Sequence, residues 1–413
     1  MKTKQTKSAP ELRFPGFVGA WNKSSLGSET KWSSGGTPSK DNPSFWNGSI
    51  PWMSAASMHS RVYQDSPVRI TEEGLKNGSK LAKNGSLLLL VRGSMLWNRI
   101  PVGIATRDVA FNQDVKALIP SKNVTAEFLL QWFVSSENEL LHKVVGTGIG
   151  AGKLDTADTQ NVALILPTLP EQRKIADFLT AVDGRIGQLI QKKALLEDYK
   201  KGVMQQLFTQ AIRFKDDHGN DFPDWEEKKL GEVSRNVMYG MNAAAQPFDG
   251  VTKYIRITDI DESSNKFCPD PVTSPDEPAE ERYKLQRGDI VFARTGASVG
   301  KSYLYDEADG NLAFAGFLIR FSIRQEVADA YFVYLLTQTS DYRKWVKINS
   351  MRSGQPGINA EEYKTLPFKL PSLPEQTKIA DFLSALDRKI ASVATQITET
   401  QTFKRGLLQQ MFV

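Results

Sequence analysis

The chain has 413 residues, of which 40% are hydrophobic and 24% charged, so it is too long for one ordinary domain and has the composition of a globular protein of two or three domains. The net charge of +5 suits a polyanionic partner and equally an ordinary basic protein. One cysteine, Cys268, excludes an intramolecular disulfide and a thiolate zinc cluster, and the three histidines are too scattered to predict a metal site.

The start of the chain carries no targeting signal. Residues 1–12 are polar and basic and lack the apolar core of a secretory signal. The longest apolar run, Leu87–Val91, is too short to cross a bilayer. We therefore expect a cytoplasmic protein with no membrane partner.

Residues 1–165 combine strand and helix signals. A short apolar run at Ser86–Val91 follows an Asn-Gly turn and predicts a buried strand. A helix is predicted at Thr125–Ser136, and a glycine-rich loop follows at Gly146–Lys153. This mixture predicts a globule of the α/β or α+β class.

A long helix is predicted in the next segment, 166–211. Pro170 suits the first helical position because its missing N–H has no helical partner there, and Glu171 then lies in the first turn, where a negative charge favours the helix dipole. Apolar residues recur every seven positions from Ile175 to Val203, which predicts a coiled-coil seam. With a rise of 1.5 Å per residue, such a helix is roughly 58 Å long.

Residues 212–369 predict a second globule of the same class. Its signals repeat those of the first: a buried strand at Asp289–Ala293 after Arg-Gly, a helix near 328–338 and a glycine-rich loop at Ser353–Gly357. A second long helix is predicted at 370–413. The order is therefore globule, helix, globule, helix.

The two helical segments are copies of each other. Leu166–Phe208 aligns with Leu370–Phe412 at a constant offset of 204 positions without a gap, and Leu-Pro-Glu-Gln begins both helices. A lone helix cannot bury such an apolar stripe, so we expect a pseudo-two-fold repeat in which two globules are separated by two long helices that form an antiparallel coiled coil. The alternative is that each helix packs only on its own globule, and Thr400 weakens the predicted seam locally.

With two divergent domains that are each followed by a Leu-Pro-Glu-Gln helix, the chain resembles the specificity subunits of type I restriction–modification systems. Further similarity lies in Gly35–Ser39, Phe45–Gly48 and Ile50–Trp52 of the first globule and in Arg294–Lys301 of the second. The resemblance extends over 14–413. The duplicated helix makes it specific.

The resemblance implies a DNA-binding and assembly protein without chemistry of its own. Each globule is then a target recognition domain that reads one half of a bipartite site in double-stranded DNA, and the helices fix the gap between the halves. Two modification subunits dock on the chain and carry S-adenosylmethionine and adenine methylation. Restriction subunits add translocation and cleavage driven by ATP and Mg. No catalytic residue, metal or cofactor is expected in this chain.

Candidate DNA contacts are the residues of the variable loops that suit phosphates or base edges. In the first globule they are Lys40, Trp46, Arg92, Asn98, Arg99 and Lys153. In the second they are Tyr254, Arg256, Arg294, Ser298, Lys301, Arg352 and Gln355. For each single cation, a solvated surface charge is the competing interpretation. For Trp46, core packing is the favoured one.

Two other classes of function remain as alternatives. A stand-alone DNA methyltransferase or nuclease is weakly mimicked by Asn42–Phe45, which lacks the second proline of a methyltransferase motif. Gly296–Ser302 is one residue too short for a nucleotide-binding loop, and the residues after it predict a strand where that loop requires a helix. The third class is a coiled-coil scaffold with protein ligands alone, which salt-dependent DNA binding would distinguish.

Overall fold

The computed structural model describes residues 9–148, 150–262 and 264–413. The first part of the polar start, 1–8, and Ile149 of the predicted glycine-rich loop lie outside the described residues. The chain forms two compact units, and each combines one globule with parts of two long helices. Unit 1 comprises Met1–Gln191 with Ala394–Val413, and unit 2 comprises Lys192–Val393.

The globule of unit 1 mixes several sheets with short helices. Its largest sheet has five strands in the order β2-β11-β7-β9-β4, and the next has four in the order β5-β3-β10-β6. Two smaller sheets have the orders β12-β13-β8 and β1-β14. The strands are β1 (Asn22–Ser25), β2 (Thr30–Ser34), β3 (Trp46–Met53), β4 (Val62–Tyr63), β5 (Arg69–Ile70), β6 (Lys80–Ala82), β7 (Leu87–Leu90), β8 (Arg92–Gly93), β9 (Val102–Ala105), β10 (Val109–Phe111), β11 (Val115–Pro120), β12 (Val144–Gly146), β13 (Gly152–Leu154) and β14 (Ala163–Leu166). The short helices are α1 (Glu72–Gly78), α2 (Ala126–Ser135), α3 (Glu137–Leu141) and α4 (Thr156–Gln160).

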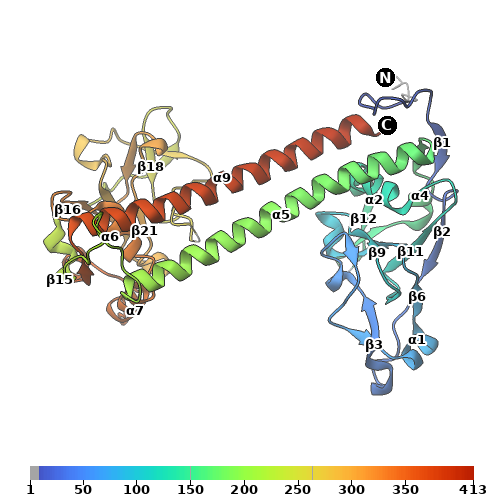
Figure 1. Cartoon of the computed structure of the whole chain (residues 1–413), viewed down its shortest axis with the longest axis horizontal. Helices are drawn as coiled ribbons and strands as arrows, with labels where there is room; N and C mark the ends of the chain where they lie inside the picture. The colour runs from blue at the N-terminus through green and yellow to red at the C-terminus, as the bar shows by residue number, and fades with distance from the viewer. Residues whose placement is uncertain (1–8, 149, 263) are drawn as a thin grey trace. The chain divides into compact units, whose positions relative to one another are not determined.

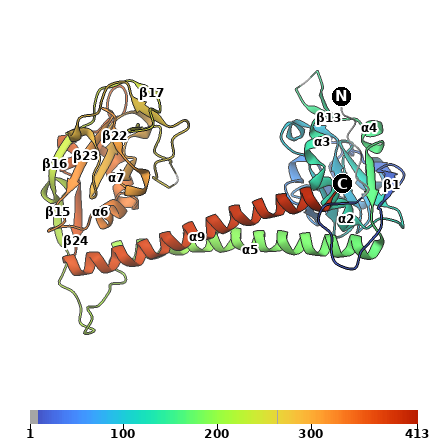
Figure 2. The ribbon, with the colours of Figure 1, turned by 90° about the horizontal axis from the view of Figure 1, so that it is seen from above.

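The core of this globule forms around β7 and α2. All four leucines of β7 are 0% exposed, and the strand lies between antiparallel β11 and β9, which confirms the predicted buried strand. The predicted helix is α2, which begins after Thr125 because that hydroxyl accepts the N–H of Phe128 at 3.2 Å. Phe128 and Leu129 are 0% exposed and share one core with Ile175 and Leu179 of the long helix α5 (Leu169–Phe208), whose first turns lie beside α2 (Figure 2).

The globule of unit 2 is built around one four-stranded sheet in the order β16-β23-β20-β21, with two-stranded sheets β15-β24, β17-β19 and β18-β22. The predicted strand at Asp289–Ala293 is β20, and all of its residues are buried. The strands are β15 (Glu226–Lys229), β16 (Ser234–Tyr239), β17 (Ala245–Pro247), β18 (Lys253–Ile255), β19 (Thr273–Pro275), β20 (Asp289–Ala293), β21 (Ser302–Leu304), β22 (Leu312–Phe314), β23 (Leu318–Ile323) and β24 (Pro367–Leu370). The short helices are α6 (Ala330–Leu336), α7 (Ser340–Asn349) and α8 (Ala360–Lys364).

The two predicted long helices are α5 (Leu169–Phe208) and α9 (Leu373–Met411), of 40 and 39 residues (Figure 1). Each begins at the leucine of its Leu-Pro-Glu-Gln motif and continues without a break. In the described part of the chain, no helix has an apolar stretch long enough to cross a membrane.

Within each unit, part of α5 packs against part of α9. In unit 1, Leu179 of α5 and Leu407 of α9 belong to one core, and Lys404 donates to Asp183 at 2.7 Å. Unit 2 repeats the arrangement with the copies exchanged: Lys200 of α5 donates to Asp387 of α9 at 2.7 Å. The first half of one helix thus meets the second half of the other, as an antiparallel coiled coil requires. This excludes packing of each helix on its own globule alone.

The Leu-Pro-Glu-Gln motif fastens each helix to its globule through a fully buried glutamine. In unit 1, the amide of Gln172 accepts the N–H of Thr125 and donates to the carbonyls of Asn123 and Pro167. In unit 2, Gln376 accepts the N–H of Asp329 and donates to the carbonyls of Val327 and Pro371. Both glutamines are 0% exposed, and every partner atom is a backbone atom.

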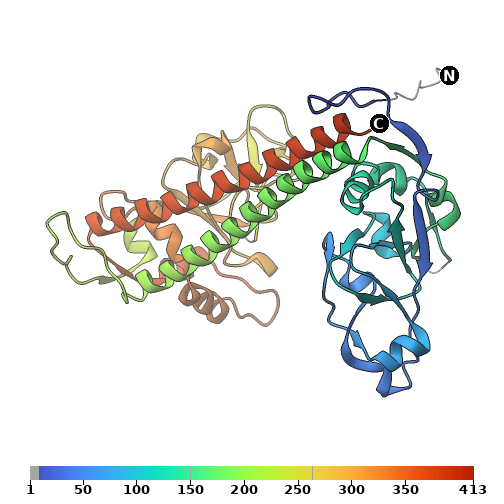
Figure 3. The same cartoon turned by 45° about the vertical axis from the view of Figure 1, so that its right-hand side comes forward.

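The described start of the chain docks on the end of α9 in unit 1 (Figure 3). The N–H of Leu12 donates to the carbonyl of Gln410, and the ring of Phe14 packs on Phe178 at 5.6 Å. The linker after α5 makes the same contacts in unit 2. There the N–H of Ile212 donates to the carbonyl of Gln206, and the ring centres of Phe214 and Phe382 lie 5.7 Å apart. The repeat therefore includes the segment before each globule.

Candidate nucleic-acid interface

In the second globule, two loops come together at one end of the four-stranded sheet. The first follows β20 at Arg294–Lys301, and the second precedes α8 at 350–358. The N–H of Gly296 donates to the carbonyl of Pro356 at 2.9 Å, and the N–H of Ile358 donates to that of Arg294 at 2.9 Å. Gly296 has a φ of +69°, and a Cβ there would lie 2.7 Å from the side-chain nitrogen of Gln355. The positive φ favours glycine at this position, whereas the flexible end of the Gln355 side chain could move away from a Cβ.

This pair of loops holds most of the residues predicted for the second globule. Gln355 is exposed and Ser298 is half-buried, so both side chains reach the surface. Lys301 lies 3.9 Å from the Glu262 carboxylate, too far for a tight ion pair. Arg352 is 40% exposed at its side chain and pairs with Glu362. The structure brings these residues together on two adjoining loops, and their contacts with DNA stay a prediction.

Arg294 is the residue of this group whose side chain is held by two aromatic rings and a backbone carbonyl. Its guanidinium carbon lies 5.1 Å from the ring centre of Tyr239 and 5.7 Å from that of Phe317, and its Nε donates to the carbonyl of Gly316 at 3.0 Å. Tyr239 ends β16 and is 41% exposed, while Phe317 precedes β23 and is 55% exposed. Neither aromatic residue was among the predicted candidates, because the sequence has no signal that places them beside Arg294.

Two predicted residues of this globule make hydrogen bonds that stabilise the fold. Tyr254 is 1% exposed, and its hydroxyl donates to the carbonyls of Met241 at 3.0 Å and Ala243 at 3.1 Å, so its side chain does not reach the surface. Burial raises the pKa of this hydroxyl. Arg256 binds the buried carboxylate of Asp259 with both Nε and Nη2, at 2.9 and 2.8 Å. These two nitrogens are held by this turn, while the side chain is 32% exposed, so a DNA contact of Arg256 stays a prediction.

In the first globule, a group of cations forms where neighbouring strands meet. Arg92 of β8 lies opposite Lys153 of β13 in an antiparallel pair. Lys116 of β11, which was not among the predicted residues, donates to the hydroxyl of Ser34 at 2.6 Å. Burial lowers the pKa of Lys116, and the charge of Arg92 lowers it further. Strand pairing alone creates this neighbourhood, so the sequence gives no signal for it.

The remaining candidates of the first globule have other surroundings. Trp46 packs edge-on against Trp52 at 5.5 Å in a small core, and its indole N–H donates to the carbonyl of Ser39 at 2.9 Å, which supports core packing. Arg99 donates to the carbonyl of Met58 at 2.9 Å and is partly buried. Lys40 and Asn98 are exposed on other loops.

The features that mimic enzyme motifs are structural. Ser302 begins the strand β21, as predicted, so Gly296–Ser302 does not open a helix as a nucleotide-binding loop does. The run Pro43–Phe45 is one turn of 3₁₀ helix. In the described ranges, no three His, Cys, Asp or Glu residues are grouped as metal ligands.

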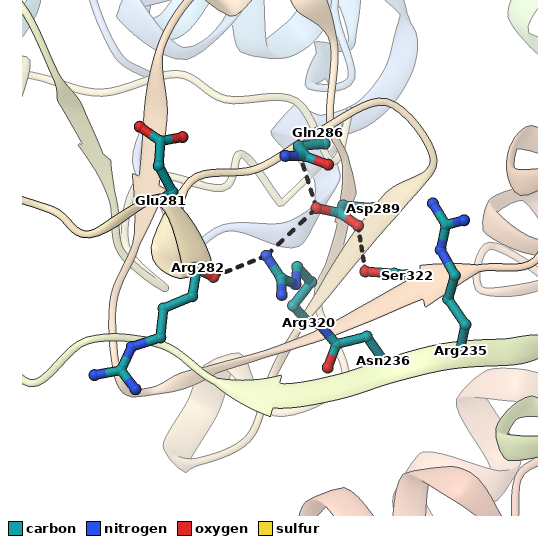
Figure 4. A pocket seen from close by; sticks show the side chains of 8 residues that line it. All are labelled: Arg235, Asn236, Glu281, Arg282, Gln286, Asp289, Arg320 and Ser322. Carbon is teal, nitrogen blue, oxygen red and sulfur yellow. Dashed lines mark hydrogen bonds and ion pairs between the residues drawn. The ribbon is translucent and has the colours of Figure 1, made fainter.

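Unit 2 also has an open polar cleft of about 540 Å³ (Figure 4). At its base, the carboxylate of Asp289 accepts the hydroxyl of Ser322 at 2.5 Å and the N–H of Gln286 at 2.9 Å, and lies 3.7 Å from Arg320. Burial raises the pKa of Asp289 despite these partners. The groups that could transfer protons are thus bound to one another. The residues that line the cleft are Arg235, Asn236, Glu281, Arg282, Gln286, Asp289, Arg320 and Ser322.

Comparison with known proteins identifies both halves of the repeat. Residues 19–198 and 223–401 match the family model described as the type I restriction modification DNA specificity domain. The specificity subunit of the Escherichia coli enzyme EcoR124I/EcoR124II is 33% identical over 160 residues, which is 38% of this chain and 40% of that subunit. The MjaVIII specificity subunit of Methanocaldococcus jannaschii is 25% identical over 346 residues, covering 81% of this chain and 80% of that protein.

Solved structures show the same fold. The S subunit of a type I restriction–modification system from M. genitalium matches with a TM-score of 0.59 at 15% identity, covering 98% of this chain and 99% of its own. A chain from a structure of type I system complex assembly matches with a TM-score of 0.57 at 16% identity, covering 97% and 99%. These matches include both globules and both long helices.

Proposed function

Because this chain belongs to the family of type I restriction–modification DNA specificity proteins, whose members recognise DNA and are not catalytic, we propose that its two globules each read one half of a bipartite site in double-stranded DNA. The observation that carries the proposal is the duplicated frame, in which Gln172 and Gln376 fasten two divergent globules to paired helices in the same way. Two different readers on one repeated frame suit an asymmetric site. The helices then set the gap between its halves.

The same frame supports the docking of two identical modification subunits. Tyr199 of α5 and Phe403 of α9 are equivalent in the repeat, and they are 53% and 55% exposed. Exposed aromatic side chains are frequent anchors of protein–protein contacts. We infer that each anchors one modification subunit, which binds S-adenosylmethionine and methylates adenine.

Restriction subunits complete the proposed complex and bind ATP and Mg. In this assignment the chain recognises DNA and organises its partners, and it has no cofactor of its own. A cytoplasmic location follows from that role, since the DNA of the cell is the substrate.

The experiment that tests the proposal is methylome sequencing. Cells that contain this gene and its cognate modification subunit are compared with cells that lack this gene alone. We expect a split motif of methylated adenines, with two defined halves and a fixed gap, that depends on the gene. If the purified complex of the two proteins binds DNA without preference and no such motif is found, the proposal is wrong.

A further inference from the structure

The backbone of Arg294 is fixed on both sides at the end of a buried strand. Its N–H donates to the carbonyl of Phe317 at 3.0 Å, and its carbonyl accepts the N–H of Ile358 at 2.9 Å. The preceding strand, β20, is buried throughout. The side chain therefore projects from a rigid base, which is what a recognition residue requires, because an ordered side chain loses less entropy when it binds.

The guanidinium of Arg294 is also fixed, and only part of it is used. The Nε donates to the carbonyl of Gly316 at 3.0 Å, and the rings of Tyr239 and Phe317 lie within 6 Å of the guanidinium carbon. No carboxylate within the described ranges pairs with this side chain. The two terminal nitrogens, Nη1 and Nη2, are thus left as a charged, planar pair of donors.

Resting on the proposed function, we propose that Arg294 reads a guanine in the half-site of the second globule. Nη1 and Nη2 donate to O6 and N7 of the base in the major groove, where only guanine offers two adjacent acceptors. Tyr239 and Phe317 are positioning residues, since their rings fix the orientation of the guanidinium plane by cation–π contact.

The surroundings of Arg294 favour a base over a phosphate. Phosphate sites usually combine several N–H donors or cations around one anion. Here the immediate neighbours of the guanidinium are two exposed aromatic rings and a carbonyl oxygen. Aromatic surface beside an arginine suits a base edge, and these immediate contacts include no second cation.

The substitution Arg294→Lys tests the assignment because it keeps the charge and removes the two-pronged donor. We expect the complex with the modification subunit to lose discrimination at one guanine of one half-site, by about 5- to 150-fold in binding. The other half-site, read by the other globule in the same molecules, reports whether the complex is assembled. Arg287→Lys is the matched control, since Arg287 is exposed at the turn before β20.

A base analogue identifies the contacted atom. Once methylome sequencing has given the motif, each guanine of the half-site is replaced in turn by 7-deazaguanine, which lacks the N7 acceptor. We expect one position to weaken binding of the unchanged complex, and we expect Arg294→Lys to be insensitive to the analogue there. Insensitivity of the unchanged complex at every guanine would overturn the inference.

The aromatic pair has its own test. Phe317→Leu should reduce discrimination at the same guanine, and Phe317→Tyr should restore it, which a purely structural role does not predict. If Arg294→Lys instead weakens all sequences evenly, Arg294 is a phosphate contact and the inference is wrong. A wild-type complex with no split motif at all would overturn the proposed function itself, and the inference with it.

Discussion

Glu171 and Glu375 are buried carboxylates at equivalent places in the first turns of the two long helices, yet their partners differ. Arg13 binds Glu171 with Nε at 2.6 Å and Nη2 at 2.8 Å. Arg213 binds Glu375 in the same way, at 3.1 and 2.8 Å, and the indole of Trp225 donates a third bond at 3.0 Å. The indole N–H of Trp21, the equivalent residue, is buried without a partner in the described chain. Glu171 therefore depends more on its arginine.

This asymmetry predicts unequal losses of stability. Arg13→Met leaves a buried carboxylate without its charged partner and should lower the free energy of unfolding of unit 1 by about 3–5 kcal/mol. Arg213→Met should lower that of unit 2 by less, because the Trp225 bond remains. Urea unfolding followed by fluorescence measures both. Arg173→Met, an exposed change in the same turn as Glu171, is the control, and equal losses for Arg13 and Arg213 would contradict the argument.

Lys116 predicts a pH dependence of DNA binding. Burial lowers its pKa, so in the free protein it loses its proton at a lower pH than an ordinary lysine. We expect Lys116, beside the candidate Arg92, to contact a DNA phosphate. A bound phosphate favours the charged form, so binding takes up a proton above that pKa, and affinity should fall as the pH rises through it. Lys116→Arg stays charged and should flatten the decrease. Binding titrations from neutral to alkaline pH measure this, and identical profiles for both proteins would exclude a role for Lys116.

At the scale of elements, the long helices were predictable and the reading surfaces were only partly so. The seven-residue period and the Leu-Pro-Glu-Gln motif are local signals, and α5 and α9 begin within the predicted segments. Arg294 was predicted because it lies in a variable loop and begins the family-like motif Arg294–Lys301. Its partner Phe317 lies in the connection before β23. Tyr254 was predicted as a DNA contact, and packing buries it. Strand order decides such neighbourhoods, and sequence pattern does not record strand order.

The coiled coil predicts that its length sets the gap between half-sites. Insertion of seven residues after Ala194 in α5, matched by seven after Thr398 in α9, preserves the seam and adds about 10 Å of helix. We expect the gap in the methylated motif to lengthen by about three base pairs, since the rise of DNA is about 3.4 Å per base pair. Methylome sequencing measures it. An insertion in α5 alone, which breaks the register, is the comparison, and an unchanged gap would refute the idea of a ruler.

At the scale of the whole molecule, the repeat predicts the stoichiometry of assembly. Tyr199→Ala should remove one modification subunit and leave a complex of one specificity chain with one partner, and Phe403→Ala should do the same. The double variant should bind none. Light scattering coupled to size-exclusion chromatography gives the masses. Lys193→Ala is the control, because Lys193 is a partly exposed residue of α5. Loss of both partners in either single variant would show that the two anchors are not independent.

The buried glutamines have a consequence for how such a protein changes over evolutionary time. Gln172 and Gln376 bind only backbone N–H and carbonyl groups of their globules. Any side chains that let the chain follow the same path satisfy the joint equally well. This attachment of globule to helix therefore constrains the backbone path of the globule and places little constraint on its side chains. A lineage can replace one entire globule, and with it one half of the DNA site that the protein recognises, without changing the helices on which the complex assembles.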